Sequence, residues 1–339
     1  MAQTRATWGD GFIKGVAAEF YDVENQAEKG YSQAFSSALG IENNNQNSLF
    51  KQKSSDKAEE TIAQMSGFNY PELTSEGENY KGDTRKPGYQ TKYQFIQKTK
   101  SVEFTKIFYD DRNGNLESKF DEAKNLKLSF MLEYDRSAFS IFNYAFTAQA
   151  SLPADLTYFA DGKPMCSIAH PLADSESDTD SNASATGMPL SEVNLETAKT
   201  ELREQTDDRG LPMSIGSGKL ILLVPHTLEK TAQIIANSTL RSGTANNDMN
   251  IYDGTITVIS TKWISNSISG NDYGDTNWFL IDSLFSPFCF FMRENYVADN
   301  YIDKKNKNFV HDISSRWIVG NDSWRGVWGS KGDGVAYSG

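Results

Sequence analysis

One apolar stripe, running from residue 115 to residue 148, constrains the fold of this chain more than any other feature. Its members recur at the i, i+4 and i+7 spacing of one helix face: Leu116, Phe120, Ala123, Phe130, Tyr134, Ala138, Ile141 and Ala145. Asn113-Gly114-Asn115 supplies a turn and a capping residue before it. A helix of about 34 residues would be about 50 Å long, which is too long for one compact domain. Lys127 interrupts the stripe and predicts a kink or local exposure.

A second strong signal is the apolar run Leu220–Val224, bounded by Gly218 and Pro225. Such a run is typical of a strand buried on both faces. Pro225 ends the strand and suits the first turn of a helix, where its missing N–H costs nothing. Helical spacing follows at Leu228, Thr231, Ala232, Ile235 and Ala236. These residues predict a buried strand and a covering helix, which define a core but no function.

Residues 89–109 alternate aromatic and β-branched residues with polar ones, which predicts a long β-hairpin. Only Asp83 and Glu103 balance seven basic residues in and before it: Lys81, Arg85, Lys86, Lys92, Lys98, Lys100 and Lys106. A basic hairpin in an acidic protein is expected to dock on an acidic surface. The alternative is a solvated hairpin whose lysines prevent edge-to-edge pairing.

The remaining segments predict mixed helix and strand. Residues 1–80 are polar and predict an arm rather than a core, with short helical patterns at 12–37 and 56–65. Residues 161–190 predict a hairpin with an acidic tip, and Ser191 caps a predicted helix to about Thr206. Four further strands are predicted at 255–259, 278–281, 288–297 and 309–319.

Composition excludes several functional classes. The net charge of -12 argues against a free-standing nucleic-acid binder, because phosphate contacts need Lys and Arg. Two cysteines, Cys166 and Cys289, make no disulfide framework and fit a reducing compartment. No apolar signal segment follows Met1, and no run approaches the roughly 20 apolar residues of a membrane span. The aromatic content of 12% is high and fits a protein with much contact surface.

Motifs for chemistry are incomplete. His170, His226 and His311 lie far apart, and Cys166 with His170 is one pair short of a zinc site. Gly216-Ser217-Gly218-Lys219 is no phosphate loop, because Met213 and Leu220 stand where the pattern needs Gly and Ser or Thr.

Residues 174–185 resemble a calcium loop only in their acidic start. Thr179 stands where that loop needs Gly, and Ala185 stands where its last carboxylate belongs. We therefore predict no enzyme, no catalytic, cofactor-binding or metal-binding residue, and no cofactor. His170 is predicted to form structural hydrogen bonds, and Asp207 and Arg209 to fix a turn through hydrogen bonds and an ion pair.

Several ordered blocks resemble one known family. Residues 207–212 read DDRGLP, residues 222–225 LLVP, and residues 237–248 NSTLRSGTANND. Asp161-Gly162-Lys163 and Ala169-His170-Pro171-Leu172 precede them, and 277–280 (NWFL) and 324–329 (WRGVWG) follow. Together these blocks resemble the major head (capsid) subunits of Mu-like tailed phages, over roughly residues 160 to 330.

The resemblance implies an α+β, Hong-Kong-97-type capsid fold. Its parts would be an N-terminal arm at 1–80, an extended hairpin (E-loop) at 81–112, an axial domain at 190–285 and a C-terminal tail at 331–339. The peripheral domain, which contains the long spine helix, would comprise 113–189 and 286–330.

The resemblance also implies the function of a major capsid protein, which self-assembles into hexamers and pentamers of an icosahedral head around double-stranded DNA. Expected partners are further copies of the chain, scaffolding, portal and possible decoration proteins, with DNA enclosed without sequence readout and no membrane. The expected location is the virion, after assembly in the host bacterial cytoplasm. Contacts between subunits are expected at the seven basic residues and at Trp324, Arg325 and Trp328.

Three alternatives remain open at this stage. An encapsulin-like compartment would share the fold but store an enzyme. A tail or decoration component would be a phage structural protein outside the shell. A soluble enzyme would be built around His170 and the acidic loop.

Overall fold

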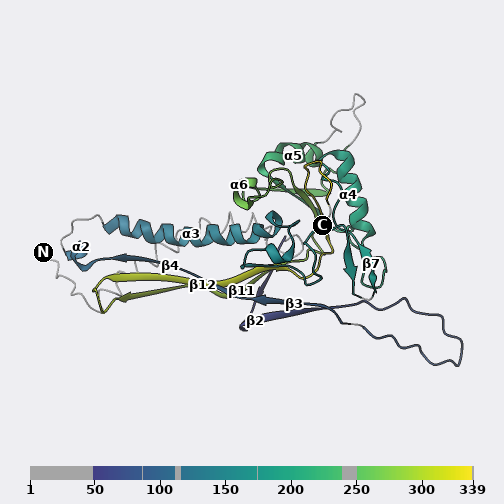
Figure 1. Ribbon diagram of the computed structural model, residues 1–339, viewed down its shortest axis with the longest axis horizontal. Coiled ribbons are helices and arrows are strands. Elements are labelled where there is room, and N and C mark those ends of the chain that lie inside the picture. The colour runs from purple at the N-terminus through teal and green to yellow at the C-terminus, as the bar shows by residue number, and fades with distance from the viewer. Residues whose placement is uncertain (1–48, 86, 111–115, 174, 239–249, 338–339) are drawn as a thin grey trace.

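The computed structural model describes residues 49–337, apart from residue 86 and segments 111–115, 174 and 239–249. The subunit is elongated (Figure 1). A long helix and long strands occupy one end, a helix-covered sheet lies above the other, and a finger projects beyond it. Within the described residues, no helix is long and apolar enough to cross a membrane.

The main sheet has the order β1-β11-β12-β4, and β5 pairs with β12 off this path. Its strands are β1 (Lys51–Ser54), β4 (Ile96–Phe104), β5 (Leu156–Thr157), β11 (Phe288–Ile302) and β12 (Phe309–Asn321). β1 runs parallel to β11, and β12 runs antiparallel to both β11 and β4. The two long strands predicted near the C-terminal end of the chain are confirmed.

The long predicted helix is confirmed as α3 (Leu116–Asn143), 28 residues that lie along one face of this sheet (Figure 1). The described part of its apolar stripe packs on the strands: the Tyr134 ring contacts Trp317, with centroids 4.5 Å apart. The Tyr134 hydroxyl shares a 2.7 Å hydrogen bond with Ser315. The exposure predicted at Lys127 is wrong, because this side chain is buried with its ammonium 4.5 Å from the Tyr296 ring centroid. A cation–π contact allows the lysine to interrupt the stripe without facing water.

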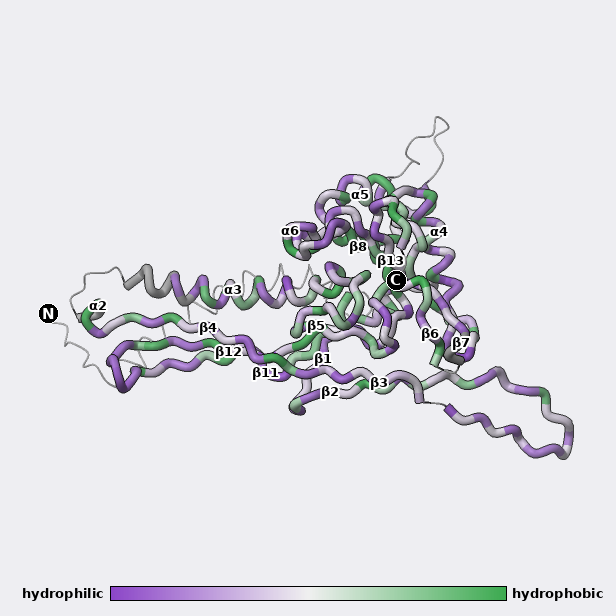
Figure 2. Tube along the Cα trace, viewed as in Figure 1, coloured by the Kyte–Doolittle hydropathy of each residue, from purple (hydrophilic) through white to green (hydrophobic). Residues whose placement is uncertain are grey.

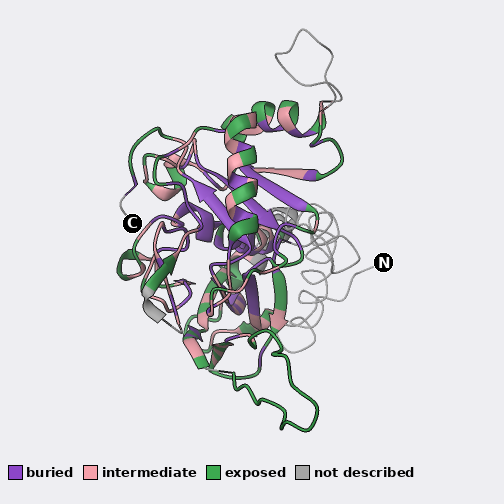
Figure 3. Ribbon diagram, turned by 90° about the vertical axis from the view of Figure 1, so that its right-hand side faces the viewer, coloured by how far each residue is buried: buried purple, intermediate pink, exposed green. Residues whose placement is uncertain are grey.

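A second sheet has the order β13-β10-β8-β9. Its strands are β8 (Leu220–Pro225), β9 (Ile256–Thr261), β10 (Trp278–Asp282) and β13 (Val327–Ser330). Helices α4 (Glu192–Glu204) and α5 (Glu229–Asn237) cover one face, and Figure 3 shows its buried strands behind a partly exposed helix.

Burial of this sheet on both faces explains the uninterrupted apolar run of β8. Leu220, Leu222 and Val224 pack with α4 and α5, whereas Ile221 and Leu223 belong to the core that contains α3. The predicted strand is therefore confirmed, and so is the predicted helix after it. A 3-10 turn, η2 (His226–Leu228), follows Pro225 and leads into α5.

Shorter elements complete the chain: α2 (Lys106–Asp110), η1 (Gln149–Ser151), β6 (His170–Leu172), β7 (Ser175–Asp180) and α6 (Asn266–Ser269). Ser191 caps α4 as predicted, since its side chain accepts a 3.2 Å hydrogen bond from the Asn194 N–H. β6 and β7 form the predicted hairpin.

The hairpin predicted over residues 89–109 is wrong. β3 (Pro87–Gln94) pairs with β2 (Glu59–Met65), whereas β4 pairs with β12 in another sheet. One residue, Phe95, separates β3 from β4, which leaves no room for a reversing turn. Period-two alternation indicates a strand but does not identify its partner, which a turn signal must supply.

The actual projection consists of β2, β3 and residues 66–86 between them, and we call it the finger. Residues 66–85 have no regular secondary structure, and the tip reverses at a turn in which the Glu78 N–H donates to the Ser75 carbonyl. Gly77 has φ +86°, a left-handed value that suits glycine in the third position of a type II turn. Figure 2 shows the finger as mostly hydrophilic, with hydrophobic positions interspersed.

The base of the finger packs under the main sheet, on the face opposite α3. Tyr93 of β3 is buried against Phe291, with ring centroids 4.8 Å apart, and its hydroxyl donates to the Asn321 carbonyl over 2.6 Å. The finger therefore has a fixed base and a free tip.

Two predicted domain boundaries do not match the pairing of strands. β13 lies within 286–330, the segment assigned to the peripheral domain, yet it pairs with β10 in the sheet of the predicted axial domain. β1 and β2 lie within the predicted arm of 1–80 but pair with β11 and β3. Predicted arm residues 1–48 lie outside the described residues.

Candidate assembly surfaces and the polar junction

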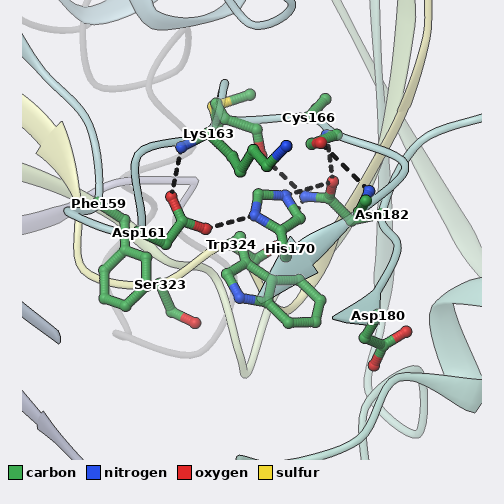
Figure 4. A network of polar contacts seen from close by, with 12 residues as sticks. Phe159, Asp161, Lys163, Cys166, His170, Asp180, Asn182, Ser323 and Trp324 are labelled. Carbon is green, nitrogen blue, oxygen red and sulfur yellow. Dashed lines mark hydrogen bonds and ion pairs between the residues drawn. The ribbon is translucent and has the colours of Figure 1, made fainter. Parts of the chain in front are cut away.

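Blocks that lie far apart in the sequence meet in one buried polar cluster, which we call the junction. Its members come from the DGK, AHPL, DDRGLP and WRG blocks and from the end of β7: Asp161, His170, Asn182, Asp208, Trp324 and Arg325. Figure 4 shows that His170 lies between Asp161 and Asn182, beside the indole of Trp324. The junction connects the β6–β7 hairpin, the segment between α4 and β8, and the segment before β13.

His170 uses both ring nitrogens. Nδ1 lies 2.5 Å from Asp161 Oδ2, and Nε2 lies 3.0 Å from Asn182 Oδ1 (Figure 4). The ring stacks on Trp324 at 4.6 Å between centroids, with 2° between the planes. The side chains of His170 and Asp161 are both 1% exposed. The predicted structural hydrogen-bonding role of His170 is therefore confirmed.

The orientation of Asn182 fixes a proton on Nε2 of His170. Asn182 Nδ2 donates to the Met165 and Trp324 carbonyls, each over 2.9 Å. Its Oδ1 accepts from the Ser167 N–H over 2.8 Å, so this atom is the amide oxygen. Nε2 of His170 must then donate to Oδ1. Nδ1 faces the Asp161 carboxyl, so the ring is held between two hydrogen-bond partners.

Arg325 and Asp208 form a second buried ion pair, with Nη2 3.0 Å from Oδ1 and side chains 5% and 4% exposed. The guanidinium carbon lies 4.3 Å from the Trp324 ring centroid, and Nε donates to the Thr206 carbonyl. A planar guanidinium can make these contacts together. Trp324 thus contacts both His170 and Arg325, and each of these side chains has its own carboxyl partner.

The turn at DDRGLP ties the junction to the finger. Asp207 Oδ1 accepts from the N–H groups of Arg209 and Leu211 over 2.8 and 2.9 Å, which confirms the predicted hydrogen bonds. The ion pair of Arg209 goes elsewhere, to Asp83 at the base of the finger, with Nη1 2.7 Å from Oδ2. Arg209 Nη2 also donates to the Thr84 carbonyl over 2.7 Å.

The side chains of the junction hold distant segments of the chain together. His170 and Arg325 each have a carboxyl partner, the amide of Asn182 is saturated, and the members of the junction are shielded from solvent. Nothing in this arrangement leaves a base or nucleophile facing a substrate space. Among the described residues, no group of three or more His, Cys, Asp or Glu side chains could hold a metal ion.

Comparison with known protein families matches the part of the chain that contains the junction. The model of the phage capsid protein family matches residues 134–327, which is more than half of the chain and includes every junction residue. The chain belongs to the phage capsid protein family. It is therefore a phage capsid protein, a structural component of the virion. No curated protein sequence matches the capsid protein.

Solved capsids share its fold. The Mycobacterium phage Patience structure has a TM-score of 0.54 at 13% identity, with 95% of this chain and 89% of that chain covered. The capsid of Ralstonia phage GP4 has a TM-score of 0.52 at 12% identity, with coverage of 86% and 88%. The predicted Hong-Kong-97-type fold is therefore confirmed, whereas the finer likeness to Mu-like phages stays a prediction.

The basic residues predicted to contact other subunits do not share one environment in the capsid protein. Lys81 pairs with Glu72 within the finger, and Arg85 Nε donates to the Ser66 carbonyl over 2.9 Å. Lys86 lies outside the described residues. Lys92, Lys100 and Lys106 are exposed.

Lys98 is used within its own subunit. Its ammonium lies 2.7 Å from Glu133 on α3 and 2.8 Å from Asp155, and 4.7 Å from the Trp317 ring centroid. Arg136 also pairs with Glu133, at 2.6 Å. Burial raises the pKa of Glu133, but hydrogen bonds from Arg136 and Lys98 outweigh it, so the pKa lies below its ordinary value. This cluster fastens β4 to the middle of the spine helix.

The aromatic residues predicted as contacts are also internal. Trp324, Arg325 and Trp328 are buried within one capsid subunit. Trp328 packs on Trp278 at 5.1 Å, and its indole N–H donates to Glu201 over 2.7 Å. These side chains offer a neighbour no exposed surface, so we assign them to the junction and the core of the second sheet.

Sequence reasoning missed the exposed apolar residues of the finger. Leu73 is 99% exposed and Tyr80 is 95% exposed, and Phe68 and Tyr70 lie mostly in solvent too. Ser75-Glu76-Gly77-Glu78 carried the usable signal, since glycine in the third position of four polar residues indicates a reversing turn. The hairpin that this turn closes lies before the one that we predicted.

Proposed function

We propose that copies of this capsid protein self-assemble into hexamers and pentamers, and that these tile an icosahedral head around double-stranded DNA. One observation supports the proposal most. The finger projects from the subunit with Leu73 and Tyr80 almost fully exposed, although its base is firmly packed through Tyr93. Exposed apolar side chains on a projecting segment mark an interaction site.

The mechanism is geometric. A finger that leaves one subunit and binds a different surface on the next makes a head-to-tail contact, and such contacts close into rings. Single contacts can be weak, because a closed shell multiplies them in the manner of multivalent binding. The junction and the Lys98 cluster would hold the finger, the spine helix and the second sheet at fixed angles, so that every copy presents the same geometry.

The domains take these roles in a revised division. The second sheet with α4, α5 and β13 is proposed as the axial domain, which packs around local symmetry axes. The main sheet and α3 are proposed as the peripheral domain. The finger, residues 59–94, replaces 81–112 as the extended hairpin, and the arm shortens to residues 1–48.

The wider partners follow from this role. We propose scaffolding, portal and possible decoration proteins as partners, with assembly in the host bacterial cytoplasm before incorporation into the virion. DNA would be enclosed without sequence readout, since a net charge of -12 would repel the polymer rather than trap it. The proposed role is structural, with no catalytic step.

Truncation of the finger tests this function. In one variant, residues 67–84 are replaced by a short Gly-Ser linker that keeps β2 and β3 joined. We expect a folded monomer, because the core contacts of Tyr93 remain, and no particles by sedimentation or negative-stain microscopy, with or without candidate scaffolding protein. A matched control replaces only the exposed Lys57 and Glu59 by Ala and should still assemble. Normal particles from the truncated chain would overturn the proposal.

A further inference from the structure

The charge of the finger is concentrated at its tip and is negative. We call residues 70–81 the fingertip, and every one of them is exposed. It carries Glu72, Glu76 and Glu78 against Lys81 alone, a net charge of -2 from three acids and one base. Four of the lysines that suggested a basic hairpin lie outside the fingertip: Lys92 on β3, Lys98 and Lys100 on β4, and Lys106 on α2. The fingertip therefore requires a basic rather than an acidic receptor.

A basic surface lies at the other end of the subunit. The loop that joins β11 to β12, residues 303–308, reads DKKNKN and is here called the basic turn. Lys304, Lys305 and Lys307 are exposed, and none of the ion pairs in the described part of the chain includes them. With Asp303, the turn has a net charge of +2 from three bases and one acid.

The basic turn has a defined shape. The Lys307 N–H donates to the Asp303 carbonyl and the Asp303 N–H to the Asn308 carbonyl, each over 2.9 Å. Asp303 Oδ1 accepts from the Lys305 N–H over 2.8 Å. Lys307 itself has φ +62°. A loop held by its own hydrogen bonds presents its lysines without a large ordering cost on binding.

Apolar surface adjoins the basic turn. Val297 and Tyr301 lie on the same exposed face of β11, each more than 40% exposed. Asp299 lies between them on that face, and Asp312 is hydrogen bonded to Tyr301. The positive charge therefore lies at the end of the hairpin, with an apolar and weakly acidic strip behind it. This pattern complements the fingertip, where Leu73 and Tyr80 flank Glu76 and Glu78.

The two surfaces lie at opposite ends of the long axis (Figure 1), so a finger cannot reach the basic turn of its own subunit. We propose that the fingertip of one copy docks on the basic turn of a second copy. The contact joins different surfaces on the two partners and has the head-to-tail form that shell assembly requires. This inference rests on the proposed function and adds the receptor for the finger.

Charge exchange tests the contact under conditions in which the unchanged full chain forms particles. Variant one carries Lys304→Glu, Lys305→Glu and Lys307→Glu, and variant two carries Glu76→Lys and Glu78→Lys. Each should lower the particle yield by about tenfold or more, since opposite charges become like charges. Their combination should restore particles. Arginine at 304, 305 and 307 is the matched control and should assemble normally. Full assembly of variant one would overturn this inference and leave the proposed function standing.

Cross-linking identifies the receptor directly. In Leu73→Cys, the introduced thiol is exposed whereas both native cysteines are buried. A short reagent that joins a thiol to an amine is applied to assembled particles, and mass spectrometry identifies the captured lysine. We expect Lys304, Lys305 or Lys307 of a second copy. Lys81 lies in the same fingertip, so its capture within one copy is expected and decides nothing. Capture of lysines of a second copy only outside the basic turn would overturn the inference, and so would failure of the combined variant to restore particles.

Discussion

The ammonium of Lys98 lies 2.7 Å from the carboxylate of Glu133, and this contact fastens an edge strand to the spine helix. A lysine that the sequence suggested for contact with another subunit is thus occupied within its own. We expect Lys98→Met to lower the free energy of unfolding by about 2 kcal/mol, between the values of exposed and buried pairs. Denaturant unfolding measures this change. Lys92→Met, at an exposed position of β3, is the control and should change stability little; equal losses would show that Lys98 has no special role.

Acid should weaken the same contact. The pKa of Glu133 is lower in the folded protein than in the unfolded chain, so folding favours the charged carboxylate. The resulting stability is complete above the ordinary glutamate value of 4.5 and is lost as the pH falls below it. In Glu133→Gln, unfolding free energy should depend less on pH in that range. An identical acid dependence in the variant and the unchanged chain would contradict the assignment.

The buried pair of Arg325 and Asp208 should show strong coupling. Removing one partner leaves an unpaired buried charge, which typically costs about 3–5 kcal/mol. Arg325→Met and Asp208→Asn should therefore each destabilise the protein by about 3 kcal/mol or more, and the double variant by less than the sum. Thermal or denaturant unfolding of all four proteins completes the cycle. Simple additivity would show that the two side chains act independently.

The protonation of His170 can be observed directly. The hydrogen bonds of Asn182 require Nε2 of His170 to donate, so the ¹⁵N chemical shift of Nε2 at neutral pH should be that of a ring nitrogen that carries a proton. Asn182→Asp keeps the acceptor at Nε2 and should leave that proton in place. His226 is exposed and serves as an internal reference. A bare Nε2 in the unchanged protein would contradict the assigned hydrogen-bond pattern.

Elements with strong local periodicity could be predicted from the sequence. The apolar run at 220–224 became β8, because a strand covered on both faces has no polar side. The stripe of the spine helix was equally clear, although the helix ends at Asn143 rather than residue 148. In both cases the decisive interactions are local or are encoded in the repeat itself.

Partner choice between strands could not be predicted in the same way. The alternation in β3 and β4 indicated two strands, but pairing them with each other ignored the missing turn at Phe95. Likewise, nothing local shows that Lys98 meets Asp155, or that His170 meets Trp324 across more than 150 positions. Ion pairs and ring stacking of this kind depend on tertiary structure. The sequence blocks indicated which segments matter but not which of them lie together.

The central claim is that the exposed tip of the finger binds another copy of the chain. Electron cryo-microscopy of particles formed by the full chain tests it most directly. We predict closed shells of hexamers and pentamers in which the density of residues 66–85 crosses to a neighbouring subunit and covers Leu73. Shells in which each finger lies against its own subunit, or a chain that stays monomeric with its scaffolding protein present, would contradict the account.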